Sequence, residues 1–333
     1  MVEYSVCYIM DHFIYSAISS LASFAYDHPL VTLILSVIIT ITMGYGNFSK
    51  LLCVSQNTQP DYDYESERGP HSWETSGTEN QSPIDIKTSL VEKSIIQEQL
   101  MWNHYNDIPT KVTMENNGRT VILKAKYAAN IPTISGADLF HSYSFESLCF
   151  HWGYSNTEGS EHTIDGRKYA MELQATHKSE PMLPCLTNLH SLIIAYVFQV
   201  AAYNPFFDPI VLNLHRIKEP GTIVEIPPFP LAWLCYQFKS GFFSYGGSNS
   251  IPPCDEGVEW FINPEPIAIG ENQLMEFRSL LSSDGSSRII RNSRPVQCLN
   301  TNRIVHYNNY ERSDSLCSCD SQQQLSNANE SDN

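Results

Sequence analysis

The sequence predicts a mostly β protein with a few short helices, an α+β fold built around one main domain. The dipeptide Asn117-Gly118 lies inside VTMENNGRTVILKAKY, between two runs rich in strand-forming residues. It favours a type I′ hairpin, because Asn and Gly tolerate the positive φ angles that both central turn residues require. The run LHSLIIAYVFQV, residues 189–200, is apolar over the length of a strand and predicts a strand buried on both faces.

Residues 1–53 form an N-terminal extension that contains one strongly apolar segment. No charged residue occurs in residues 29–49, where LVTLILSVIITITM is dense in Leu, Ile and Val. Such a segment is typical of a transmembrane span or a signal anchor. The alternatives are a long signal peptide or a simple extension. The expected localisation is therefore at a membrane or in the secretory pathway.

The orientation of this apolar segment stays open. Lys50 follows it directly, and by the positive-inside rule this favours a cytosolic main domain. Three Asn-X-Ser sequons, at Asn47, Asn80 and Asn329, instead suit a lumenal domain. Short sequons also arise by chance, so neither observation decides the side.

Two polar segments bound the predicted domain, which comprises residues 64–311. Residues 54–63 are polar and acidic without apolar periodicity, which indicates a linker. Residues 312–333 contain almost no apolar side chains and are predicted to be disordered.

The best helical pattern within the domain is ENQLMEFRSLLSS, residues 271–283. Its apolar side chains Leu274, Phe277, Leu280 and Leu281 recur at helical spacing and would share one face. We therefore expect this segment to be a helix that packs on the sheet.

The charge of the chain argues against nucleic acid as a partner. The formal net charge is -16 at pH 7, and no basic stripe with interleaved aromatic residues offsets it. The nine cysteines include no CxxC pair, so neither a zinc knuckle nor a redox motif is indicated. An acidic surface and a membrane tether suit recruitment of another protein, whereas the oligomeric state is not indicated.

Three side chains have the arrangement of a metal site. Cys149 and His151 are two residues apart, so on a strand they project from the same face. Gln174 lies in KYAMELQATH, a second predicted strand. If the two strands pair, the three side chains converge, as a catalytic zinc ion with an open fourth position requires. His177 cannot replace Gln174, because an offset of three residues points it to the opposite face.

Several motifs resemble the α-carbonic anhydrase family. They are QSPIDI at Gln81, FHWG at Phe150, GSEHTIDGRKYAMEL at Gly159, PPC at Pro252 and RPVQ at Arg294. The resemblance extends over about 250 residues in uniform order. It implies a single domain around a large, mainly antiparallel twisted sheet, with a central conical cleft that reaches a zinc ion held by three histidines.

The resemblance places the three zinc ligands at Cys149, His151 and Gln174, so two of the three histidines are replaced. It also places Glu161 and Ser250 where the family orients zinc-bound hydroxide, and Arg119 where a histidine shuttles protons. Four further positions correspond to cleft residues, and these are Tyr64, Asn117, Val258 and Trp260.

These replacements predict a loss of activity. The family reaction needs zinc to lower the pKa of water from 15.7 to about 7. A set of thiolate, imidazole and neutral amide is not a usual catalytic donor set. We therefore expect no cofactor, or zinc at low occupancy, and a carbonic anhydrase-related protein that acts by binding.

Two other functions stay open at the level of sequence. The first is a weak zinc-dependent carbonate dehydratase that uses a Cys/His site. The second is a binder of a small molecule or anion in the cleft, anchored by Arg119 or Ser250.

Overall fold

The computed structural model describes residues 62–75, 77, 79–179, 191–300 and 302–310. The predicted extension 1–53 with its apolar segment, most of the predicted linker and the predicted tail 312–333 lie outside these residues. In the described part, no helix is both long enough and apolar enough to cross a bilayer.

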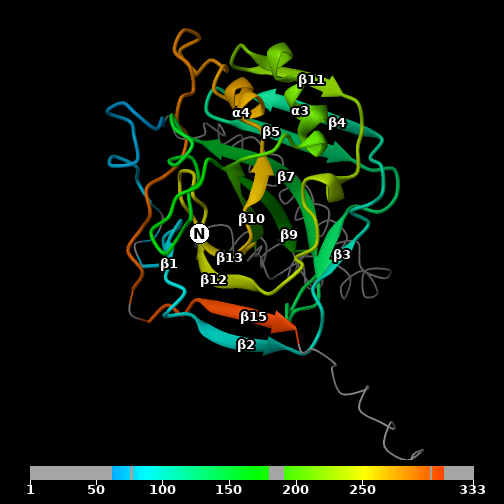
Figure 1. Cartoon of the computed structure of the whole chain (residues 1–333), viewed down its shortest axis with the longest axis vertical. Coiled ribbons are helices and arrows are strands. Elements are labelled where there is room, and N and C mark those ends of the chain that lie inside the picture. The colour runs from blue at the N-terminus through cyan, green and yellow to red at the C-terminus, as the bar shows by residue number, and fades with distance from the viewer. Residues whose placement is uncertain (1–61, 76, 78, 180–190, 301, 311–333) are drawn as a thin grey trace, which may run out of the picture. The chain divides into compact units, whose positions relative to one another are not determined.

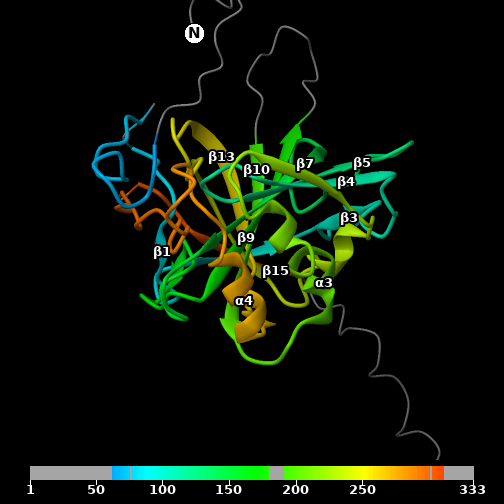
Figure 2. The ribbon, with the colours of Figure 1, turned by 90° about the horizontal axis from the view of Figure 1, so that it is seen from above.

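The described residues form a large mixed sheet and a small two-stranded sheet, seen from two directions in Figure 1 and Figure 2. The strands are β1 (Asp85–Ile86), β2 (Glu92–Ile96), β3 (Met101–Asn103), β4 (Lys111–Asn116), β5 (Val121–Lys126), β6 (Thr133–Ser135), β7 (Tyr143–Trp152), β8 (Thr163–Ile164), β9 (Met171–Ser179), β10 (Ser191–Val200), β11 (Thr222–Ile226), β12 (Phe242–Ser248), β13 (Glu256–Ile262), β14 (Ile267–Ile269) and β15 (His306–Tyr310).

The large sheet follows the order β11-β4-β5-β7-β9-β10-β13-β12-β15-β2. In Figure 1, β11 and β4 lie at one end of this order and β15 and β2 at the other. Most neighbours are antiparallel, but β10 pairs in parallel with β13 and β14, and β15 with β2. The prediction of a mostly β fold around a large, mainly antiparallel sheet is therefore confirmed.

The predicted hairpin is present, but its turn is not of type I′. Strands β4 and β5 pair from Lys111 with Lys126 to Asn116 with Val121, which leaves a four-residue loop, 117–120. Gly118 has a φ of 82°, whereas Asn117 is not among the residues with positive φ. Asn117 instead accepts the N–H groups of Arg119 and Thr120 on its side-chain oxygen, so it stabilises the longer loop.

The apolar run 189–200 forms β10 from Ser191 onward, and residues 189–190 lie outside the described residues. Strand β10 pairs with β9 on one side and with β13 and β14 on the other. Its residues from Leu192 to Phe198 are all buried, as predicted for a strand covered on both faces. This position in the sheet explains the absence of polar alternation, because neither face of the strand contacts water.

The helices are short and are α3 (Asp208–Val211), α4 (Glu271–Phe277), η2 (Pro205–Phe207), η3 (Leu214–Ile217) and η4 (Leu231–Trp233). The predicted helix 271–283 begins at Glu271 as expected, but it ends at Phe277. Beyond it, the backbone of Leu281 donates to Lys218 and bridges Arg288, so the chain leaves the helix for contacts with other segments. Leu281 is accordingly only partly buried.

The alternation of side chains along the central strands divides the core into two clusters. Phe150, Trp152 and Leu173 point to the larger cluster, where Phe277 of α4 packs against the two aromatic rings at centroid distances of 5.3 and 5.6 Å. The smaller cluster lies on the other face and includes Trp260. The predicted metal-site side chains share that second face, because they alternate with residues of the larger cluster.

His177 is buried on the face opposite Gln174, as predicted. Its Nδ1 lies 3.2 Å from the carbonyl oxygen of Leu192 and its Nε2 contacts the hydroxyl of Tyr105. A carbonyl only accepts, so Nδ1 carries the proton and Tyr105 donates to Nε2. Burial lowers the pKa of His177 to about 4, which keeps the ring neutral at physiological pH.

The contact between α4 and the sheet gives a first prediction. Phe277→Ala removes a fully buried ring and should lower the free energy of unfolding by about 3 to 5 kcal/mol. Met275→Ala on the same helix is the control, because Met275 is 48% exposed and its truncation should change stability by less than about 0.5 kcal/mol. Denaturant unfolding measures both, and equal effects would contradict the packing described.

The neutral state of His177 gives a second prediction. Between about pH 6.5 and 4, His177 binds a proton in the unfolded chain but stays neutral in the folded chain. The free energy of unfolding therefore falls as the pH falls. The contribution of this group is about 2 to 3 kcal/mol between pH 7 and 4.5. His177→Gln should remove that part of the pH dependence of unfolding. His215→Gln, at an exposed histidine, should leave the wild-type slope, and an unchanged slope in both variants would refute the assignment.

Candidate functional site

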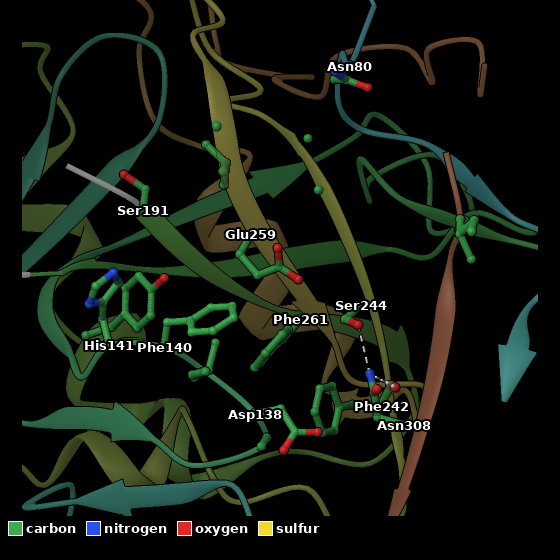
Figure 3. Close-up of a pocket in the computed structure, with 18 of the residues that line it drawn as sticks. Asn80, Asp138, Phe140, His141, Ser191, Phe242, Ser244, Glu259, Phe261 and Asn308 are labelled. Carbon is green, nitrogen blue, oxygen red and sulfur yellow. Dashed lines mark hydrogen bonds between the residues drawn. The ribbon is translucent and has the colours of Figure 1, made fainter. Parts of the chain in front are cut away.

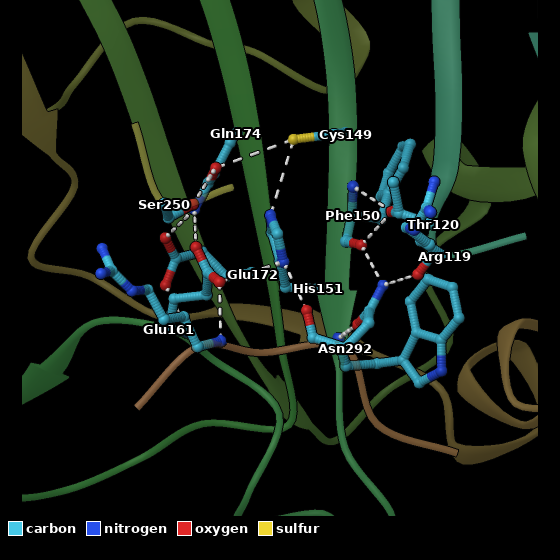
Figure 4. Close-up of polar contacts among 12 residues, drawn as sticks. Arg119, Thr120, Cys149, Phe150, His151, Glu161, Glu172, Gln174, Ser250 and Asn292 are labelled. Atoms are coloured by element: carbon cyan, nitrogen blue, oxygen red, sulfur yellow. Dashed lines mark hydrogen bonds and ion pairs between the residues drawn. The ribbon is translucent and has the colours of Figure 1, made fainter. Parts of the chain in front are cut away.

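The pairing of β7 with β9 positions the predicted metal-site residues. Cys149 is opposite Gln174 and His151 is opposite Glu172, so all four side chains project from one face (Figure 4). The predicted convergence of two strands is therefore confirmed. Cys149 is partly exposed, whereas the other three are buried, so the site is open to solvent on the side of the thiol.

The donor atoms of the predicted ligand positions meet at short range. Cys149 Sγ lies 3.6 Å from His151 Nε2 and 3.7 Å from Gln174 Oε1. Ser250 Oγ lies 3.5 Å from the same Gln174 oxygen. The structure thus brings together Cys149, His151, Gln174 and Ser250, as the sequence predicts.

The Nδ1 atom of His151, on the side of the ring away from Cys149, fixes the orientation of the ring. Its Nδ1 donates to the backbone oxygen of Asn292 at 2.8 Å and lies 3.3 Å from Glu161 Oε1. Burial is the largest single influence and disfavours the charged ring, but Glu161, Cys149 and the backbone of Asn292 together outweigh it and raise the pKa of His151 to about 10. The contact with Glu161 therefore favours the protonated form of the ring.

Gln174 is oriented by two buried carboxylates. Its Nε2 donates to Glu161 Oε2 at 2.7 Å and to Glu172 Oε1 at 2.9 Å. Since ionised carboxylates only accept hydrogen bonds, the amide NH₂ must face them. The amide oxygen is left to face Cys149 and Ser250.

Glu172 is the most strongly hydrogen-bonded carboxylate of the site. Its Oε2 accepts the backbone N–H groups of Glu161 and His162, and its Oε1 lies 2.8 Å from His162 Nδ1. Burial alone would raise the pKa of Glu172, but His162 and the hydrogen bonds lower it to about 2. Glu172 therefore stays ionised in the core.

Both oxygens of Glu161 are also occupied. Oε1 accepts the backbone N–H of Arg294 at 2.8 Å, and Oε2 accepts from Gln174. Ser250, which the resemblance pairs with Glu161, is instead directed at Gln174.

Arg119 and Tyr64 are two further predicted site residues, and Arg119 contacts Tyr62 near Tyr64 in the sequence. Arg119 Nε donates to the backbone oxygen of Tyr62 at 2.6 Å, and its guanidinium lies 4.3 Å from the centre of the Tyr62 ring. The Tyr64 hydroxyl is buried and has no hydrogen-bond partner among the described residues. Burial, followed by the charges of Tyr62, Glu161 and Cys149, raises the pKa of Tyr64 well above its ordinary value.

Of the three remaining predicted cleft residues, Val258 and Trp260 lie on the face of the site, whereas Asn117 lies in the loop between β4 and β5. Val258 and Trp260 project from the same face as the site, since β13 registers with β10 and β10 with β9. Trp260 packs on His162 at a centroid distance of 4.7 Å. Asn117 uses its side-chain oxygen within its own loop, and its predicted role in ordering water stays a prediction.

Sequence reasoning missed two residues that organise the site. His162 connects Glu172 to the Tyr245 hydroxyl, 2.7 Å from its Nε2. The Asn292 side chain accepts the N–H of Trp152 and donates to Phe150, while its backbone orients His151. His162 directly follows Glu161 in a recognised motif, which is a usable signal, whereas nothing in the sequence pattern marks Asn292.

The residues fit a zinc ion in spacing but not in donor chemistry. The ideal separation of two ligand atoms around tetrahedral zinc with Zn–S of about 2.3 Å and Zn–N of about 2.0 Å is about 3.5 Å, near the distances from Cys149. However, the third donor is a neutral amide, which is a weak ligand for this ion. No group of three His, Cys, Asp or Glu side chains suited to a metal occurs among the residues that the structure describes.

Comparison with known proteins agrees with the fold and the motifs. The family model of eukaryotic-type carbonic anhydrases matches residues 68–309. The chain is 28% identical over 290 residues to "Putative carbonic anhydrase 5" of Caenorhabditis elegans, covering 84% of this chain and 89% of that protein.

Two further relatives cover 73% of this chain each. "Putative carbonic anhydrase 3" of Caenorhabditis elegans is 31% identical over 243 residues and is covered to 95% of its length. "Carbonic anhydrase 1" of Monodelphis domestica is 31% identical over 256 residues and is covered to 97%. The chain therefore belongs to the eukaryotic-type carbonic anhydrase family.

Proposed function

We propose that this chain is a carbonic anhydrase-related protein that has lost the catalytic zinc and acts by binding another protein. The observation that carries the proposal is the position of Gln174. Its amide occupies a ligand position and donates to both Glu161 and Glu172. This removes one imidazole from the metal site and gives the two buried carboxylates the donors that they require.

The groups that would orient a zinc-bound hydroxide are engaged elsewhere. Glu161 already accepts from Gln174 and from the backbone of Arg294. The nearest partner of the Ser250 hydroxyl is the Gln174 oxygen. A hydroxide at this position would have to displace these contacts before it could be oriented.

A second feature that disfavours catalysis is the residue at the position from which protons would be transferred to solvent. By the family resemblance Arg119 corresponds to the shuttle histidine, and a guanidinium offers only N–H donors and no acceptor nitrogen for a proton. Its contacts with Tyr62 further restrict its movement. Efficient turnover would lack a proton acceptor even if zinc were bound.

A protein partner at a membrane is supported by the overall charge and by the N-terminal segment. The chain carries a formal net charge of -16, which favours a basic partner surface. The apolar residues 29–49 would tether the domain at a membrane or direct it to the secretory pathway.

A second candidate function is a weak zinc-dependent carbonate dehydratase. The distances of 3.6 and 3.7 Å from Cys149 Sγ to His151 and Gln174 favour it, because they are close to ligand separations in a tetrahedral site. Zinc content separates the two functions.

The test compares the wild type with Cys149→His, Gln174→His. We expect the purified wild type to hold less than about a tenth of an equivalent of zinc and to hydrate carbon dioxide at background rate. The double variant should bind zinc and gain measurable activity, since Glu172 can accept a hydrogen bond from the new imidazole as it does from Gln174.

Two controls sharpen the result. Adding Arg119→His to the double variant should raise the rate further, because it restores a proton acceptor. Adding His151→Ala instead should abolish the gain in zinc binding. One equivalent of zinc with activity in the wild type would overturn the proposal and establish the dehydratase.

A further inference from the structure

A second cavity lies on the face of the sheet opposite the Cys149 site. It is an open hollow of about 660 Å³ over β12 and β13 and is bordered by the loop 136–142, which leads into β7 (Figure 3). Glu259 and Phe261 line it, and they alternate along β13 with Trp260, which faces the site described above. Glu259 and Phe261 therefore project from the face of the sheet opposite the Cys149 site.

Glu259 is an unpaired carboxylate in this cavity. Within the described residues its side chain makes no hydrogen bond and no ion pair, in contrast to Glu161 and Glu172. Burial raises the pKa of Glu259 to about 7, with no neighbouring positive charge acting against it. Because Glu259 is partly buried, its ionised form would be stabilised by a cation that enters the cavity.

Aromatic rings and a second carboxylate surround the space beside Glu259. Phe242 and Phe261 form its apolar floor, and Asp138 and Phe140 project from the loop. Phe140 is 95% exposed, an unusual position for a large apolar side chain.

The backbone of the loop has two strained residues. Ala137 and Asp138 have φ angles of 51° and 62°, a region that residues with a Cβ rarely adopt. The backbone N–H of Ala137 donates to the backbone oxygen of Glu98 at 3.2 Å, and the backbone N–H of Leu139 donates to the backbone oxygen of Gly136 at 3.0 Å. Strain of this kind persists where the surroundings impose it and is frequent at ligand sites.

Arg303 borders the cavity but does not neutralise Glu259. Its two terminal nitrogens donate to the backbone oxygens of Gln81 and Gly246, both at 2.9 Å. Its guanidinium lies 5.2 Å from the centre of the Tyr245 ring, a residue of the opposite face.

We propose that this cavity binds an alkylammonium group, carried by a small amine or by a lysine side chain. Glu259 supplies the negative charge, and the aromatic side chains of the lining, which include Phe140 and Phe261, supply cation–π contact. The proposal does not depend on the state of the Cys149 site, so the two can fail separately.

Calorimetric titration of the purified full-length chain tests the proposal, with n-butylammonium and Nα-acetyl-lysine methylamide as probes and butyrate as the anionic control. We expect binding of the cations and none of butyrate. Binding of both cations supports the site as stated, and binding of the lysine derivative alone identifies the protein side chain as the source. Absence of binding by both would overturn the proposal.

Variants locate the binding. Glu259→Gln should weaken it about tenfold, and Phe140→Ala about threefold. Glu276→Gln is the matched control, because it removes the same charge from an exposed position on α4 and should leave the affinity unchanged. Equal affinity of the Glu259→Gln variant and the wild type would overturn the proposal, with the fold of each variant checked by circular dichroism.

The pH dependence adds a readout that a structural role of Glu259 would not give. The affinity should rise between about pH 6 and 8 as Glu259 ionises, while the probes stay cationic. The other titratable or charged groups that line the cavity are Asp138, His141, Tyr143, Glu256 and Arg303. In the Glu259→Gln variant the rise should vanish, and its persistence would assign the effect to one of these groups and refute the role of Glu259.

Discussion

The site around His151 depends on how two buried carboxylates are supplied with hydrogen-bond donors. Glu161 and Glu172 lie in the interior of the sheet, where an ionised group without donors would cost several kcal/mol. Gln174, His162 and three backbone N–H groups provide these donors. The network connects three segments of the chain, because its donors come from residues 161–162, from Gln174 of β9 and from the backbone of Arg294.

Features that depend on periodicity and on motifs could be predicted from the sequence. The two-residue spacing of Cys149 and His151, together with the alternation around Gln174, correctly placed these side chains on one face. The continuous apolar run correctly gave β10. The motifs identified the family, and the family model covers residues 68–309.

Features that depend on distant contacts could not be read from local patterns. The helix at Glu271 ends early because Leu281 bonds to Lys218, which is distant in sequence. The turn at Asn117 is longer than the dipeptide suggests, because the Asn side chain caps backbone N–H groups instead of entering a tight turn. Asn292 organises the site through backbone and amide contacts, and these leave no signature in residue type or spacing.

The substitution at Gln174 also bears on how such a domain can change over time. A metal ion that only fills a gap between charged groups can be lost without collapse once an uncharged side chain offers equivalent N–H donors. The amide at this position does so from within the strand itself. Under the function proposed above, the folding of this sheet would not depend on the supply of an ion, and residues at its solvent-open edge, such as Cys149, would be released from selection for coordination.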